Sequence, residues 1–127
     1  MRLEEFRKTI VDNFMKDCIV DEAEWIINED GSIDVFGNVS TIPYKFLKIP
    51  FKFRKIYGNF NCSYSYMDNL KNCPDEVKDY FCCSHNQLTS LEFSPKKCGS
   101  FLCGNNAIQF TKEDVRKICE VSGGITV

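Results

Sequence analysis

Cysteine and histidine are the residues of this chain best suited to chemistry: it has eight cysteines and one histidine in 127 residues. A thiolate can attack an electrophile or bind a metal, and a nearby imidazole can take up its proton. Cys82 and His85 are close enough in sequence to form such a nucleophile and base pair. No third residue that would orient the histidine, and no oxyanion donor, is identifiable, so we expect no catalytic site.

Metal binding and disulfide formation are the other roles open to the cysteines. The sequence has no C-x2-C pair, and the adjacent residues Cys82 and Cys83 would point to opposite faces of a strand. The segment 1–20 is not a signal peptide, so we expect a cytoplasmic protein whose thiols stay reduced. Metal ligation and redox disulfides remain alternatives, but packing is favoured, and we expect neither a metal nor a cofactor.

The overall composition excludes several classes of function. A net charge of −2 indicates neither a mimic of a polyanion nor a protein with general affinity for nucleic acid. No apolar run approaches the ~20 residues needed to cross a bilayer, so we expect no membrane association. A chain of this length corresponds to a single domain, 1–127.

An internal repeat of about 20 residues gives most cysteines a structural role. Segment 60–67 matches segment 81–88 at a spacing of 21 residues, and segment 101–108 follows 20 residues later. A fourth copy at 33–38 precedes its neighbour by 27 residues. Segments 42–46 and 49–53 resemble tandem copies of a seven-residue piece, and removing one copy restores a spacing of 20. We therefore predict four units with one widened connection.

Each unit has the pattern apolar-x-apolar-x-x-Asn-x-apolar, which is typical of a leucine-rich repeat. Alternation along a short strand predicts two inward columns, Ile33/Phe60/Phe81/Phe101 and Val35/Cys62/Cys83/Cys103. A buried amide is needed where the chain turns, and the residues suited to that role are Asn38, Asn86 and Asn106, with Ser65 as a shorter substitute. Met67, Leu88 and Ile108 are expected to return to the core.

The two ends of the array 31–110 are predicted to carry caps, which cover the apolar ends of a solenoid. In segment 1–20 the apolar residues recur at helical spacing and predict a capping helix that faces the array; they are Leu3, Phe6, Ile10, Phe14 and Cys18. Segment 23–36 predicts a β-hairpin that leads into the first repeat. In segment 111–127, Thr111 and Asp114 form an approximate capping box for a helix over 112–121. The fold class is thus an α+β, leucine-rich-repeat-like solenoid with short parallel strands, sealed at both ends.

The repeats resemble those of small leucine-rich-repeat proteins of tailed bacteriophages. The resemblance covers about residues 28–127 and lies in segments 58–63, 73–77, 86–92 and 110–119. It implies the same architecture and a protein made in the cytoplasm of an infected bacterium. Such a protein would bind and modulate a host or phage protein, with counter-defence as one possibility.

The outward side of the strands is the first candidate for a partner site. Aromatic and apolar residues mixed with small polar ones there are typical of a protein-binding patch. The expected contact residues are Asp34, Phe36, Asn61, Tyr80, Cys82 and Leu102. Our leading hypothesis is a non-catalytic protein-interaction module that is a monomer or a weak homodimer.

The basic and aromatic segment 44–57 is the second candidate. It contains five basic residues and no acidic one, and such a segment can bind an anionic strand by phosphate contact and stacking. The residues concerned are Lys45, Lys48, Lys52, Arg54 and Lys55. Nucleic-acid binding is therefore the alternative function, and a structural or assembly component is the third.

Overall fold

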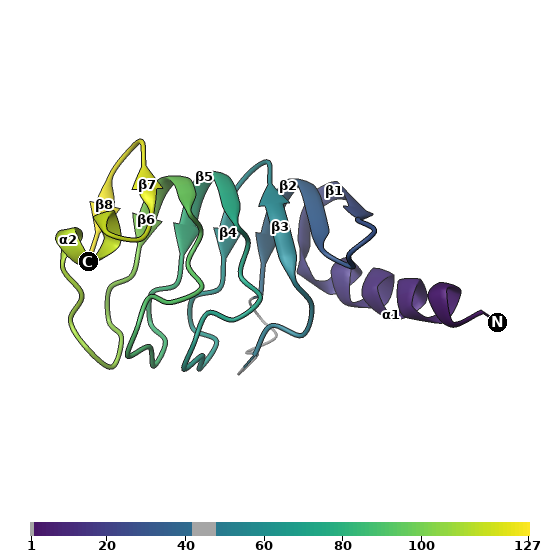
Figure 1. Ribbon diagram of the computed structural model, residues 1–127, viewed down its shortest axis with the longest axis horizontal. Helices are drawn as coiled ribbons and strands as arrows, with labels where there is room; N and C mark the ends of the chain where they lie inside the picture. Colours follow the sequence, from purple (N-terminus) through teal and green to yellow (C-terminus); the bar gives the residue numbers. More distant parts are fainter. Residues whose placement is uncertain (1, 42–47) are drawn as a thin grey trace.

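The computed structural model describes residues 2–41 and 48–127 as an N-terminal helix followed by a β-solenoid of about four turns (Figure 1). The strands stack side by side along the long axis, and the described termini lie at opposite ends. The elements are α1 (Leu3–Cys18), β1 (Ile19–Ile27), β2 (Ile33–Ser40), β3 (Phe53–Ile56), β4 (Phe60–Asn61), β5 (Glu76–Cys82), β6 (Lys97–Leu102), α2 (Lys112–Arg116), β7 (Glu120–Val121) and β8 (Ile125–Thr126).

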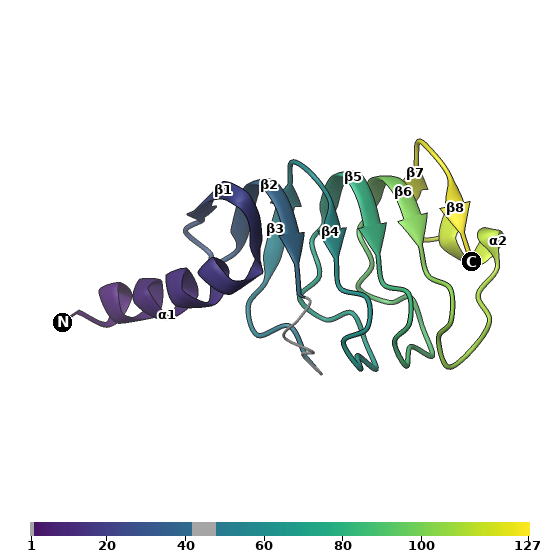
Figure 2. The same cartoon turned by 180° about the vertical axis from the view of Figure 1, so that it is seen from behind.

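One continuous sheet contains all of these strands. β1 and β2 form the antiparallel hairpin that the sequence predicts, and every later pairing is parallel (Figure 2). Each coil contributes two strand segments separated by a bend. β3 and β4 are the two segments of one coil, whereas β5 includes both, with its register shifting between Val77 and Tyr80.

Glycine allows neighbouring bends to lie in contact. A Cβ atom on Gly58 would lie 2.5 Å from the carbonyl oxygen of Gly37, and one on Gly99 would lie 2.5 Å from the carbonyl oxygen of Asp79. Any side chain would force these backbones apart, so the bends stack closely only with glycine there.

The core is a ladder of aromatic rings beside a column of thiols. The ring centroids of Phe60 and Phe81 are 6.0 Å apart, and those of Phe81 and Phe101 are 5.2 Å apart. Cys62, Cys83 and Cys103 are buried next to them, as the alternation predicts. From residue 60 onward, both predicted inward columns are confirmed.

In the first coil, the residue that aligns with Phe60 comes later in the sequence than the repeat pattern predicts. Val39, not Ile33, lies opposite Phe60, while Ile33 pairs with Phe53 and Val35 with Ile56. β2 contains both segments of its coil, and each alternates apolar residues, so the two are interchangeable by pattern alone. Val39 pairs with Phe60 across 21 residues, the same spacing as Phe60 and Phe81, so no seven-residue widening is needed. Segment 42–46 lies outside the described residues.

Buried amides satisfy the turns at two of the predicted positions. Asn86 Oδ1 accepts bonds from the backbone N–H groups of Ser65 and Met67, and Asn106 Oδ1 accepts from that of Leu88. Ser65 takes the equivalent position one coil earlier, where its hydroxyl bonds to the carbonyl of Ser63. Asn38 was wrongly assigned: its Oδ1 accepts from the backbone N–H of Asn59 at the bend, because the register of the first coil differs.

Only the second half of α1 covers the array. Val11, Met15 and Cys18 are buried, and Phe14 packs edge-on against Phe51 with centroids 5.3 Å apart. The first half projects beyond the solenoid, so the predicted contacts of Leu3, Phe6 and Ile10 with the array are absent, and these residues are exposed by 62%, 52% and 42%. Of the five apolar residues predicted to face the array, Cys18 is therefore the one that is fully buried.

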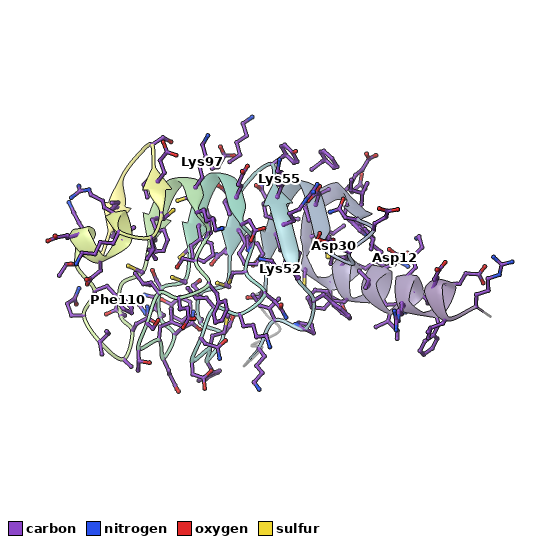
Figure 3. The ribbon with its side chains drawn as sticks, viewed as in Figure 1. Asp12, Asp30, Lys52, Lys55, Lys97 and Phe110 are labelled. Atoms are coloured by element: carbon purple, nitrogen blue, oxygen red, sulfur yellow. The ribbon has the colours of Figure 1, made fainter. Side chains whose placement is uncertain are left out.

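The C-terminal segment departs from the predicted helix. The capping box between Thr111 and Asp114 is confirmed, but α2 ends at Arg116. The chain then returns to the sheet, where β7 and β8 add a further rung beside β6. Ile108, expected in the core, is 46% exposed. Phe110, which is labelled in Figure 3, is buried instead.

Candidate functional site

Two stacked aromatic rings stand on the outer surface of the sheet. Phe36 on β2 and Tyr57 at the end of β3 have centroids 4.9 Å apart and planes within 4° of parallel. They are 49% and 48% exposed. Because each ring restricts the other, a large apolar surface is held in one orientation facing solvent.

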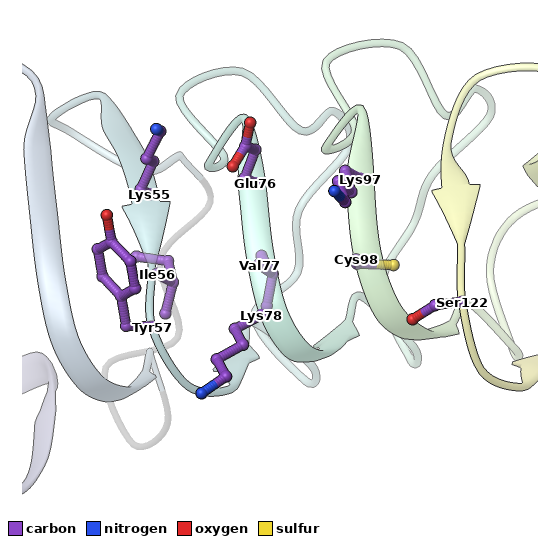
Figure 4. Close-up of a pocket in the computed structure, with 9 residues that line it drawn as sticks. All are labelled: Lys55, Ile56, Tyr57, Glu76, Val77, Lys78, Lys97, Cys98 and Ser122. Carbon is purple, nitrogen blue, oxygen red and sulfur yellow. The ribbon is translucent and has the colours of Figure 1, made fainter.

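A row of alternating charges crosses the strands beside this pair. The backbone register places Lys55 opposite Glu76, Glu76 opposite Lys97, and Lys97 opposite Glu120. Figure 4 shows Lys55, Glu76 and Lys97 side by side on three neighbouring strands. Every second residue of a strand faces the same way, so these side chains form one wall of a groove.

The groove has a volume of about 410 Å³ and runs between that row and a second one. Tyr57, Lys78 and Ser122 line the opposite side, and the segment around Ile56, Val77 and Cys98 forms the floor. Within the part of the chain that the structure describes, no carboxylate forms an ion pair with Lys55, Lys78 or Lys97. Three ammonium groups that have no ion-pair partner among residues 2–41 and 48–127 therefore line this groove.

A wider cleft of about 990 Å³ lies between α1 and the hairpin, and three charged groups of its lining, Lys8, Asp12 and Asp30, already have partners. Lys8 forms an ion pair with Asp12, which also accepts a bond from the Trp25 indole at 2.9 Å. Asp30 accepts the hydroxyl of Ser32, and this bond keeps the pKa of Asp30 below its usual value. The other charged groups of its lining, Glu4, Arg7 and Glu29, are of mixed sign, whereas the groove on the sheet brings three lysines together.

The six residues that the sequence predicts as a partner-binding strand face do not all lie on one surface of the structure. Asn61, Cys82 and Leu102 do lie in one column, and Tyr80 is half-buried in the adjacent one. Asp34 belongs to neither, since the register of the first coil is different. The expectation that Asp34 and Cys82 face a partner is wrong, because both side chains are buried.

Asp34 is engaged by the basic segment. Arg54 binds both of its carboxylate oxygens, and the backbone N–H of Lys55 donates to Oδ1 at 3.1 Å. The bond from Arg54 is the main reason that the pKa of Asp34 is lowered, against the opposing effect of burial. The carboxylate is thus a structural anion that joins β2 to β3.

The basic segment as a whole is not a free cationic surface. The ammonium group of Lys52 donates to the carbonyl of Cys73 and to Asp75, at 2.6 and 2.7 Å. Lys48 is exposed, Lys55 belongs to the groove, and Lys45 lies outside the described residues. Two of the cations proposed for nucleic-acid contact are therefore already neutralised.

The thiols are packed rather than arranged for chemistry. All eight are buried and none forms a disulfide, and burial raises the pKa of Cys18 to about 12 and that of Cys103 to about 11. Among residues 2–41 and 48–127, no group of three His, Cys, Asp or Glu side chains could hold a metal ion. His85 stacks on Tyr64, with centroids 4.2 Å apart, and bonds to Asn105.

The chain matches no family model, no curated protein and no solved structure. In the described residues, neither helix has the length and apolar character that a membrane span requires. The candidate site therefore rests on its own geometry.

Sequence reasoning missed Tyr57, Glu76, Lys78 and Lys97. A signal was present, since Lys55, Glu76 and Lys97 recur at 21-residue spacing with alternating charge. It becomes visible only when the first strand of each coil is aligned separately from the second, with Val35, Ile56, Val77 and Cys98 as its inward column.

Proposed function

We propose that the chain is a non-catalytic protein-interaction module whose contact surface is centred on Phe36 and Tyr57. The stacked, half-exposed pair is the observation that carries this proposal. Exposed aromatic residues are enriched among the residues that dominate binding energy at protein interfaces. Rings already fixed by stacking on a sheet lose little conformational entropy on binding, so they favour affinity.

The partner in this proposal is a host or phage protein in the cytoplasm of an infected bacterium. The resemblance of segments 58–63 and 86–92 to small phage leucine-rich-repeat proteins supports this assignment. Binding would modulate the partner, with counter-defence as one setting. The protein would act without a cofactor, as a monomer or a weak homodimer.

A capture experiment from bacterial lysate tests the role of the aromatic pair. We compare the wild-type chain with the double variant Phe36→Ala/Tyr57→Ala. The matched control is Tyr64→Ala/Phe93→Ala, which removes two aromatic rings that are 56% and 51% exposed elsewhere on the solenoid. The proposal expects a protein that wild type and control retain and that the Phe36/Tyr57 variant loses. Equal retention by all three proteins would refute it.

A further inference from the structure

We infer that the groove between Lys55, Lys78 and Lys97 binds an extended acidic segment of the partner protein. This inference rests on the proposed function and specifies the chemistry of its ligand. The segment would place carboxylates against the three lysines and an apolar side chain against Tyr57, which stacks on Phe36 at the edge of the same groove.

The charge at the groove is opposite to that of the whole chain. The protein carries a net charge of −2, yet the groove lining contains three lysines and one carboxylate, Glu76. Glu120 lies opposite Lys97 on the next strand and is not part of the lining. A local positive field on an otherwise acidic surface attracts and orients an anionic ligand.

The lysines of the groove differ from the other cations near it. Lys52 and Arg54 are held by Asp75 and Asp34, whereas the ammonium groups around the groove have no ion-pair partner among the described residues. A partner carboxylate would therefore form new pairs without displacing existing ones. Because Lys78 and Lys97 are exposed, each such pair contributes modestly, and specificity comes from the pattern.

The position of Glu76 favours a polypeptide over a nucleic acid. It stands between Lys55 and Lys97, with neighbouring strands ~4.8 Å apart. A nucleic-acid backbone carries a phosphate at every nucleotide, and a phosphate near Glu76 would be repelled. A polypeptide can place a neutral or basic residue opposite Glu76 and acidic residues on either side. The groove is also small, at about 410 Å³, which suits a few side chains.

An NMR titration of the full chain tests this assignment. The probe is a capped peptide with one Trp and two Glu residues flanking a Lys, and the control peptide has Gln in place of Glu. We expect the acidic peptide to shift the amides of Ile56, Val77 and Cys98 at low salt, and the Gln peptide to bind at least about tenfold more weakly, which corresponds to ~1.4 kcal/mol.

Charge-reversal variants locate the binding on the protein. Lys78→Glu/Lys97→Glu should weaken the acidic peptide about tenfold or more. Lys71→Glu/Lys112→Glu makes the same change in net charge at exposed lysines outside the groove and should leave affinity within about twofold. Dispersed spectra and unchanged urea midpoints establish that both variants fold.

Several results would overturn the inference: no shift of groove amides, equal binding of the Gln peptide, or equal weakening by both charge-reversal variants. Tighter binding of a ten-nucleotide single-stranded DNA to the same amides would assign the groove to nucleic acid instead. If the captured partner is lost by Phe36→Ala/Tyr57→Ala but retained by Lys78→Glu/Lys97→Glu, the protein-binding proposal stands and the acidic-segment inference fails. If the acidic peptide binds as expected while the aromatic variant retains every protein, only the proposed function fails.

Discussion

The side-chain amide of Asn86 donates to the carbonyl oxygen of Cys62, 24 residues earlier, at 2.9 Å. The same nitrogen also donates to the carbonyl of Cys83 within its own coil, while Oδ1 accepts from the backbone N–H groups of Ser65 and Met67. One buried side chain therefore satisfies backbone groups on two successive coils. Replacing it would leave these groups without partners in an environment that water does not reach.

We predict that Asn86→Ala lowers the free energy of unfolding by about 2 to 4 kcal/mol, since several buried polar groups lose their bonds together. Asn106→Ala should cost less, because Asn106 is only partly buried and makes fewer bonds. Urea unfolding followed by circular dichroism measures both. Asn105→Gly, at an exposed position of the same turn, is the control, because Asn105 has a φ of 55° that glycine adopts without strain. Equal midpoints for Asn86→Ala and Asn105→Gly would contradict the assignment.

The ion pair between Asp34 and Arg54 should make stability depend on pH. The pKa of Asp34 is lowered in the folded protein, so its contribution is fully present above the unfolded value, ~3.9, and is lost as pH falls through the folded pKa. At pH 7 we expect Asp34→Asn to lower the free energy of unfolding by about 1 to 2 kcal/mol, towards the lower limit for a charged bond because Arg54 is 41% exposed.

The difference between wild type and Asp34→Asn should stay constant from pH 6 down to about pH 4 and shrink below the unfolded value, ~3.9, because the unfolded chain then binds a proton at Asp34 that the folded protein takes up only at lower pH. Urea midpoints across this range measure it. Asp75→Asn is the comparison, since the Lys52–Asp75 pair is exposed on both sides and should matter less. A gap between wild type and Asp34→Asn that is constant with pH would show that the carboxylate charge is not what stabilises the fold.

The sequence is most informative where one coil can be compared with the next. Phe60, Phe81 and Phe101 share a register with the cysteines that follow them, so both inward columns were predictable from residue 60 onward. The first coil was not, because Ile33 and Val39 start equivalent apolar alternations on one continuous strand. Only the hydrogen bonds to later coils distinguish them.

That difference in register also explains why the partner site predicted from the sequence differs from the one in the structure. With Ile33 aligned to Phe60, Asp34 falls in the outward column of Asn61, although it is buried beside Arg54. Phe36 was correctly expected to face solvent. Its stacking partner Tyr57 belongs to the basic and aromatic segment 44–57, which was interpreted as a separate candidate site. Helical spacing likewise predicts an apolar face on residues 3–18 but does not determine how much of that face meets the array.

The N-terminal helix offers a direct test of this last point. Leu3→Ser/Phe6→Ser should change the free energy of unfolding by less than about 0.5 kcal/mol, because both side chains are exposed. Met15→Ala should lower it by about 2 to 4 kcal/mol, since the Met15 side chain is fully buried. Chemical denaturation of the three proteins measures this contrast. A large loss from the Leu3/Phe6 variant would mean that the first half of α1 packs against the array after all.

The sulfur atoms of Cys98 and Cys119 lie 3.6 Å apart, and this contact should determine which thiols react first. The hydrogen bond between the two thiols lowers the pKa of Cys119 and raises that of Cys98. Cys119 should therefore supply the thiolate, and Cys98 the neighbouring thiol. Cys62 and Cys73 also interact, but both are fully buried, and burial raises the pKa of Cys73 further.

We predict that diamide at pH 8 first forms the Cys98–Cys119 disulfide in the folded protein. The two thiols give up two protons and two electrons to the diazene, which becomes a hydrazine. Mass spectrometry of peptides alkylated before digestion measures the reaction. Cys119→Ser should abolish early oxidation, and Cys62→Ser should leave it unchanged, because Cys62 is fully buried. Early labelling or oxidation at Cys82 would instead favour the sequence-based expectation of an exposed thiol there, against its 9% exposure in the structure.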